Sequence, residues 1–151
     1  MKSFACIAAA VTLLTLAAPA SAQFAKPEDA IKYRQSAMFV MSQHFGRVGA
    51  MANGKVPYDA KVAETSAAVV ADMSKLPWQG FIPGTESGGN TKAKPEVWSE
   101  QAKFKENNEK LMAETTKLAA AAKTGSRDTL KTAFTATADT CKGCHDRFRN
   151  K

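Results

Sequence analysis

The chain has 151 residues, of which 21 are Lys or Arg and 14 are Asp or Glu, so its formal net charge at pH 7 is +7. This length suits a single domain with one hydrophobic core. After residue 22 no stretch reaches the roughly 20 consecutive apolar residues that a membrane-spanning helix needs, so we expect no membrane anchor.

The first 22 residues have the layout of a cleavable secretory signal. Lys2 precedes an apolar run over residues 5–18, and the small-residue sequence Ala20-Ser21-Ala22 follows it. We expect cleavage before Gln23, which leaves one domain over residues 23–151 with a formal charge of +6, because the signal carries one base and no acid. An exported protein seldom meets nucleic acid, so the basic surface is either simply solvated or docks to an acidic protein or a membrane surface.

Four stretches have the residue spacing of amphipathic helices, and proline or glycine separates them. The first, over residues 27–52, opens with a proline and two acids and stops before an Asn-Gly pair. The second covers residues 57–76. Residues 77–95 contain three prolines and four glycines, which predicts a long loop. The third helix covers residues 95–123 and the fourth residues 126–149.

The apolar residues of each predicted helix fall on one stripe, as bundle packing requires. On the third helix they repeat every seven residues, at Val97, Phe104, Leu111 and Leu118. No segment alternates polar and apolar residues as a strand does, and two of the links are short enough to join antiparallel neighbours. The sequence therefore predicts an all-α fold, an up-down-up-down antiparallel four-helix bundle.

The sequence Cys141-Lys142-Gly143-Cys144-His145 near the end of the chain is the C-x-x-C-H signature of covalent haem attachment. On a helix, residues three and four positions apart lie on one face. Two thiols can then bond the vinyl groups of a haem while the imidazole of His145 reaches the iron from the same side. We predict one haem c, with iron bound by His145.

Three other interpretations of the motif are weaker. A structural zinc site needs four nitrogen or sulfur ligands, and His44 is the one other histidine. A thioredoxin-like pair belongs at a helix start in a βαβ unit, and a disulfide between residues three apart on a helix has poor geometry. The remaining cysteine, Cys6, lies in the predicted signal.

Only six residues follow His145, so a second iron ligand would have to come from an earlier helix. With this terminal motif, the chain resembles cytochrome c′ over the whole of the predicted mature domain. The resemblance also rests on three features, which are the segment Lys32-Tyr33-Arg34-Gln35, the segment Leu76-Pro77-Trp78 with Phe81, and the terminal Arg149. It implies that Arg34, Gln35, Trp78 and Phe81 surround the haem and that Arg149 lies near the face that carries His145.

Arg34 lies within the apolar stripe of the first predicted helix, between Ile31 and Met38. A buried charge without a partner would cost several kcal/mol. A haem propionate would supply a partner, and the resemblance implies this contact. The alternative is that the stem of the arginine packs while its head reaches water.

Met38 is the candidate for the residue that faces the open side of the iron. It lies on the same stripe as Ile31, about 10 Å further along at 1.5 Å per residue, whereas Met41 is a turn higher and His44 falls off the stripe. Met38 could also be simple core packing. Trp78, Phe81 and Trp98 are expected near the ring, although aromatic residues often serve only the core.

The resemblance implies a periplasmic haem protein that binds nitric oxide and carbon monoxide at five-coordinate, high-spin iron and takes part in electron transfer. The alternative is a low-spin electron carrier with Met38 as the sixth ligand. We expect no enzyme, because no cluster of acids, bases or nucleophiles accompanies the motif. A homodimer formed through the first two helices is expected from the resemblance, and the redox partner is not indicated.

Overall fold

The computed structural model describes residues 23–151, so the predicted signal over residues 1–22 lies outside the described part of the chain. Within residues 23–151 there is no named strand, and none of the helices there is long and apolar enough to cross a membrane. The elements are, in chain order, α1 (Pro27–Ala52), α2 (Ala60–Met73), the 3-10 helix η1 (Pro77–Gly80), α3 (Glu96–Ser99), α4 (Gln101–Lys123) and α5 (Arg127–Phe148).

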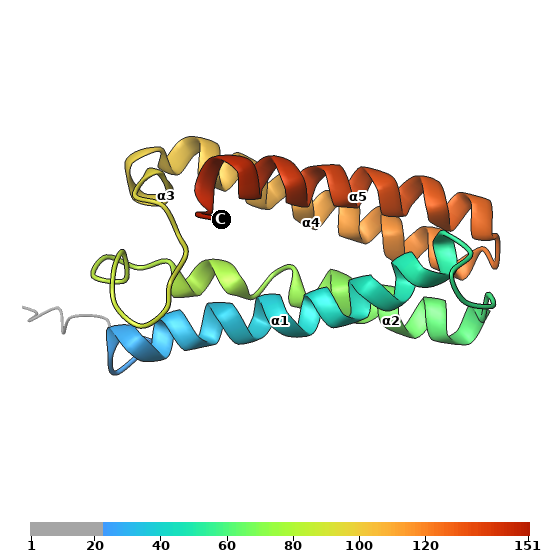
Figure 1. The fold of residues 1–151 in the computed structure, drawn as a ribbon, viewed down its shortest axis with the longest axis horizontal. Helices are drawn as coiled ribbons and strands as arrows, with labels where there is room; N and C mark the ends of the chain where they lie inside the picture. Colours follow the sequence, from blue (N-terminus) through green and yellow to red (C-terminus); the bar gives the residue numbers. More distant parts are fainter. Residues whose placement is uncertain (1–22) are drawn as a thin grey trace, which may run out of the picture.

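The four long helices form the predicted antiparallel four-helix bundle (Figure 1). Helix α1 packs against α2 and α5, and α4 packs against the same two helices, so the four close into a ring. The chain runs up α1, down α2, up α4 and down α5. The end of α5, which carries the cysteine motif, therefore lies beside the start of α1 and the loop that follows α2 (Figure 1).

The helix boundaries follow local capping. Helix α1 has the predicted bounds, with Pro27 in its first turn and Asn53 as its C-cap. Helix α2 begins later than predicted because the side chain of Asp59 accepts a hydrogen bond of 3.0 Å from the backbone N–H of Val62. It also ends earlier, at Met73, and the chain continues as the short 3-10 helix η1.

The third predicted helix is two helices, α3 and α4. Glu100 separates them with φ −119° and ψ 46°, outside the helical region. Its carboxylate forms an ion pair with Arg147 of α5. This pair joins the break between α3 and α4 to the part of α5 that carries the cysteine motif.

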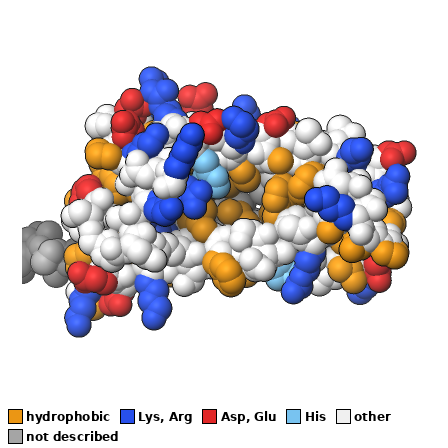
Figure 2. Space-filling model, viewed as in Figure 1, with side chains coloured by type: hydrophobic (Ala, Val, Ile, Leu, Met, Phe, Trp, Pro, Cys, Tyr) orange, Lys and Arg blue, Asp and Glu red, His pale blue; other side chains and the backbone are white. Residues whose placement is uncertain are grey.

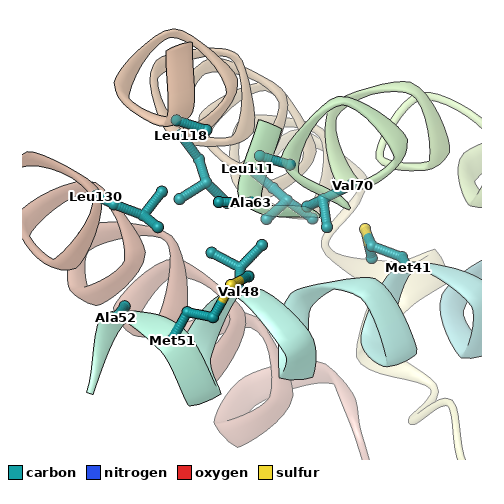
Figure 3. Close-up of a cluster of buried hydrophobic side chains, with 11 residues drawn as sticks. Met41, Val48, Met51, Ala52, Ala63, Val70, Leu111, Leu118 and Leu130 are labelled. Carbon is teal, nitrogen blue, oxygen red and sulfur yellow. The ribbon is translucent and has the colours of Figure 1, made fainter. Parts of the chain in front are cut away.

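The hydrophobic core lies in the half of the bundle that contains the end of α1 and the start of α5, and Figure 3 shows a cluster of its side chains. All four long helices contribute to it, with Val48 and Val70 of α1 and α2 facing Leu118 and Leu130 of α4 and α5. Each of these four side chains is at most 1 % exposed. Full burial of such a side chain stabilises the fold by about 1.5–3 kcal/mol, so this half anchors the bundle.

Helices α1 and α5 approach most closely beside this core. A Cβ atom added to Gly49 of α1 would lie 2.6 Å from Cζ of Phe134 of α5, and the ring of Phe134 also stacks on Phe45 at 4.4 Å between centroids. Only glycine permits this contact. The tight contact at Gly49 contrasts with the other end of the bundle, where the same two helices border a cavity.

Candidate functional site

The cysteine motif lies in the last turns of α5. Ser126 caps the start of this helix by accepting a hydrogen bond of 3.2 Å from the N–H of Thr129, and the helix continues without a break to Phe148. Cys141 and Cys144 are half-buried free thiols. The disulfide alternative is therefore wrong.

A cavity of about 890 Å³ opens beside the motif, within the size range of ligand and cofactor sites. Residues of α1, α4 and α5 line it, together with Val70 of α2, Val97 of α3, η1 and the loop over residues 90–93. Nine of the ten residues expected at or near the cofactor line it: Arg34, Gln35, Met38, Trp78, Phe81, Cys141, Cys144, His145 and Arg149. The fold thus brings together residues that are up to 115 positions apart in the sequence.

The environment of the motif favours neutral side chains. Burial, and then the charge of Cys141, raise the pKa of the Cys144 thiol to about 11. Burial, and then the cation of Arg149, lower the pKa of His145, against the opposing effect of Asp146. A neutral imidazole keeps a free nitrogen lone pair, which is the form that binds a metal ion.

Arg34 is 3 % exposed, so the interpretation in which its head reaches water is wrong. Its Nη1 donates to the carbonyl of Gly80 at 2.7 Å and to Oγ1 of Thr85 at 2.8 Å. Its Nη2 donates to the carbonyl of Thr85 at 2.9 Å and to Oγ1 of Thr91 at 2.8 Å. Both terminal nitrogens thus hold the loop after η1, and the contact with a propionate stays a prediction.

Aromatic rings line one side of the cavity. Trp78, Phe81, Phe104 and Phe148 all face it, and neighbouring pairs among them have centroids 4.9–6.4 Å apart. Trp98 does not line the cavity, although it was expected near the ring. It lies behind Phe81, at 6.2 Å between centroids, and its Nε1 donates to the carbonyl of Ile82 at 3.3 Å.

Besides Arg34 and Gln35, the α1 side of the cavity carries Met38, Phe39, Met41, Ser42 and Phe45. Met38 is half-buried and packs against the core, and Met41 is 8 % exposed. His44 does not line the cavity, as its place off the stripe predicts. The wall contributed by α1 is therefore rich in thioether and aromatic groups and contains no imidazole.

The sequence prediction missed the part that the loop plays at this site. Asn90, Thr91, Lys92 and Ala93 line the cavity, whereas the sequence predicts only a long loop over residues 77–95. The one sequence signal is Arg34, since a buried guanidinium with no acid on its own stripe requires oxygen acceptors from elsewhere. Threonines in the loop supply them.

The family model described as "Cytochrome C'" matches residues 29–149. The chain belongs to the cytochrome c′ family. Among the relatives, "Cytochrome c'" of Rubrivivax gelatinosus is 54 % identical over 129 residues, which are 85 % of this chain and 100 % of the relative. This family carries a covalently attached haem c, and the two thiols and the imidazole beside the cavity are the groups that would hold it.

Solved structures of the family superimpose well. A nitric oxide complex of a leucine-to-alanine mutant of cytochrome c prime from Alcaligenes xylosoxidans has a TM-score of 0.79 and 46 % identity, covering 85 % of this chain and 99 % of its own. A carbon monoxide-bound leucine-to-glycine variant from the same organism has the same TM-score and identity and covers 85 % and 100 %. These titles describe gas complexes of those proteins.

Proposed function

We propose that this chain is a periplasmic haem protein that binds nitric oxide and carbon monoxide at a five-coordinate, high-spin iron. His145 is the one protein ligand in this proposal. The observation that carries it is the lining of the cavity, in which His145 is the one histidine among the residues that the structure describes. The gas complexes of the Alcaligenes relatives support the same conclusion.

When bound, the haem supplies an iron atom that can take a gas ligand. The chain's own residues then decide which ligands are favoured. Of the four hydroxyls that line the cavity, that of Thr91 lies in the loop and accepts from Nη2 of Arg34. The other three, on Ser42, Thr115 and Thr137, each donate their hydrogen to a backbone carbonyl of their own helix, at 2.7, 3.1 and 2.9 Å. A hydroxyl has one proton to donate, so none of the three is left to stabilise bound oxygen or water.

We further propose that the protein takes part in electron transfer, that it forms a homodimer, and that it is not an enzyme. Support for the dimer comes from large apolar side chains that are exposed on the first two helices. Phe39 and Val40 of α1 are 63 % and 38 % exposed, and Val62 of α2 is 43 % exposed. Exposed apolar residues on adjacent helices are typical of protein interfaces.

The second candidate function is a low-spin electron carrier in which Met38 is the sixth iron ligand. The position of Met38 at the cavity favours it, because a thioether is a common axial ligand of haem. Met38→Ala distinguishes the two functions, with Met41→Ala as the control for loss of a neighbouring thioether.

Under the gas-binding proposal, ferrous Met38→Ala stays high-spin, and its association with carbon monoxide becomes several-fold faster because an obstructing side chain is gone. Spin state is read from the absorption spectrum and association from flash photolysis. A low-spin wild type that turns high-spin in Met38→Ala, but not in Met41→Ala, would establish the electron carrier instead.

A further inference from the structure

Four cations gather at one corner of the cavity, and we call Lys92, Lys94, Arg149 and Lys151 the mouth patch. Their proximity is a consequence of backbone pairing. Ala93 of the loop forms an antiparallel bridge with Arg149 beyond the end of α5. The bridge sets the segment 92–94 beside the segment 149–151, so two stretches far apart in the sequence each contribute two cations.

Two backbone hydrogen bonds, one on each side of the pair, form this bridge. The N–H of Lys94 donates to the carbonyl of Phe148 at 2.9 Å, and the N–H of Asn150 donates to the carbonyl of Lys92 at 2.8 Å. The ammonium group of Lys94 also donates to the backbone carbonyl of Asp146 at 3.2 Å. The mouth patch is therefore held by the fold and does not depend on mobile side chains alone.

The mouth patch borders the haem site directly. Lys92 and Arg149 line the cavity. Arg149 lies close enough to His145 to lower its pKa, after the larger effect of burial. The view of this face shows Lys and Arg side chains beside the hollow that hydrophobic side chains line (Figure 2).

The cations of the mouth patch form no ion pair within the described part of the chain. The hydrogen bond from Lys142 is the largest cause of the lowered pKa of Asp146, and Lys151 lies close enough to Asp146 for its charge to contribute to this lowering. Among residues 23–151, none of its four cations has a carboxylate within 4.0 Å. Neighbouring cations do have such partners, since Lys142 pairs with Asp146 and Arg147 pairs with Glu100. Like charges held together raise the local positive potential and attract an opposite charge from outside the molecule.

We infer that the mouth patch docks an acidic protein that exchanges one electron with the haem. An acidic surface around the partner's own redox centre would complement the four cations and bring the two centres close together. One electron leaves the reduced partner and reduces ferric iron to ferrous iron, and no other group changes. This inference rests on the family's haem site and is independent of gas binding.

A protein fits this surface better than a membrane does. The cations lie at one side of a concave opening, which a convex partner can enter. Lasting attachment to a lipid surface needs apolar side chains that insert beside the basic ones. The sequences Lys-Ala-Lys at 92–94 and Arg-Asn-Lys at 149–151 contain no large apolar residue.

The test uses the full chain with its haem and an acidic flavodoxin as the probe. The double variant Lys94→Glu with Lys151→Glu reverses two charges of the mouth patch, and neither residue lines the cavity. Lys123→Glu with Lys131→Glu makes the same change in net charge at the far end of the bundle, where both residues are exposed. Circular dichroism checks that each variant folds.

Isothermal titration calorimetry gives the dissociation constant, and stopped-flow mixing gives the rate of haem reduction. We expect the mouth variant to bind about tenfold more weakly and to be reduced about tenfold more slowly at low salt, with a much smaller effect in the control. High salt should remove the difference between the variants. An equal loss in both variants, or no loss in the mouth variant, overturns the inference. The inference is also overturned if the wild type binds phosphatidylglycerol vesicles but not flavodoxin, and if this vesicle binding is salt-sensitive and is lost in the mouth variant.

Discussion

Replacing Arg34 with alanine should lower the free energy of unfolding and loosen the loop over residues 81–95. Three N–H···O bonds of 2.8–2.9 Å join the guanidinium to Thr85 and Thr91 of this loop. A fourth, of 2.7 Å, reaches the carbonyl of Gly80 at the end of η1, and Cζ of Arg34 lies 4.4 Å from the ring centroid of Phe81. Hydrogen bonds to a charged group contribute about 1.5–3 kcal/mol each. Because burial of the guanidinium itself costs several kcal/mol, we expect a net loss of about 2–4 kcal/mol.

Chemical denaturation of the full chain with its haem measures this loss, and hydrogen exchange of the loop amides localises it. Arg34→Lys is the matched control, because it keeps the charge but has one nitrogen where the arginine uses two to reach four acceptors. We expect the lysine variant to recover less than half of the loss. A loss below about 1 kcal/mol for alanine, or a lysine variant as stable as the wild type, would refute the role of Arg34 as the anchor of the loop.

Two further predictions concern packing and haem attachment. Gly49→Ala should lower the free energy of unfolding by about 1–3 kcal/mol, because its methyl group overlaps the ring of Phe134. Gly46→Ala is the control, since nothing lies within 4 Å of its added Cβ, and it should raise the free energy of unfolding by about 0.5–1 kcal/mol. Thermal denaturation compares the two variants, and equal effects would contradict the packing argument. Cys141 and Cys144 should each hold the haem by a thioether. Mass spectrometry after acid-acetone extraction should therefore find the mass of the haem still on the chain. Loss of the haem into the acid-acetone phase would contradict covalent attachment.

Helix spacing and terminal signals were enough to predict the bundle. Prolines, glycines and capping residues are local features, so the bounds of α1 follow directly from Pro27 and the Asn-Gly pair. The break at Glu100 could not be predicted in this way. Its partner Arg147 is 47 residues away, and no local pattern reports an ion pair over that separation.

Cys141, Cys144 and His145 could be predicted from the haem-attachment signature itself, whereas the residues expected around the haem, which are Arg34, Gln35, Trp78, Phe81 and Arg149, came from the resemblance to cytochrome c′. Once Cys141, Cys144 and His145 occupy the end of α5, antiparallel topology places α1 and the segment after α2 beside them. The loop is different, because the bridge between Ala93 and Arg149 depends on backbone hydrogen bonds that any residue except proline can make. Neither the wall it forms nor the mouth patch could therefore be read from side-chain patterns.

The most direct test of the proposed function is the absorption spectrum of the reduced wild-type chain at neutral pH, before and after carbon monoxide is added. With His145 as the one protein ligand, we predict a high-spin ferrous spectrum that converts to that of a carbon monoxide complex. A low-spin ferrous spectrum that does not respond to carbon monoxide would contradict the proposal and would indicate that Met38 occupies the sixth position.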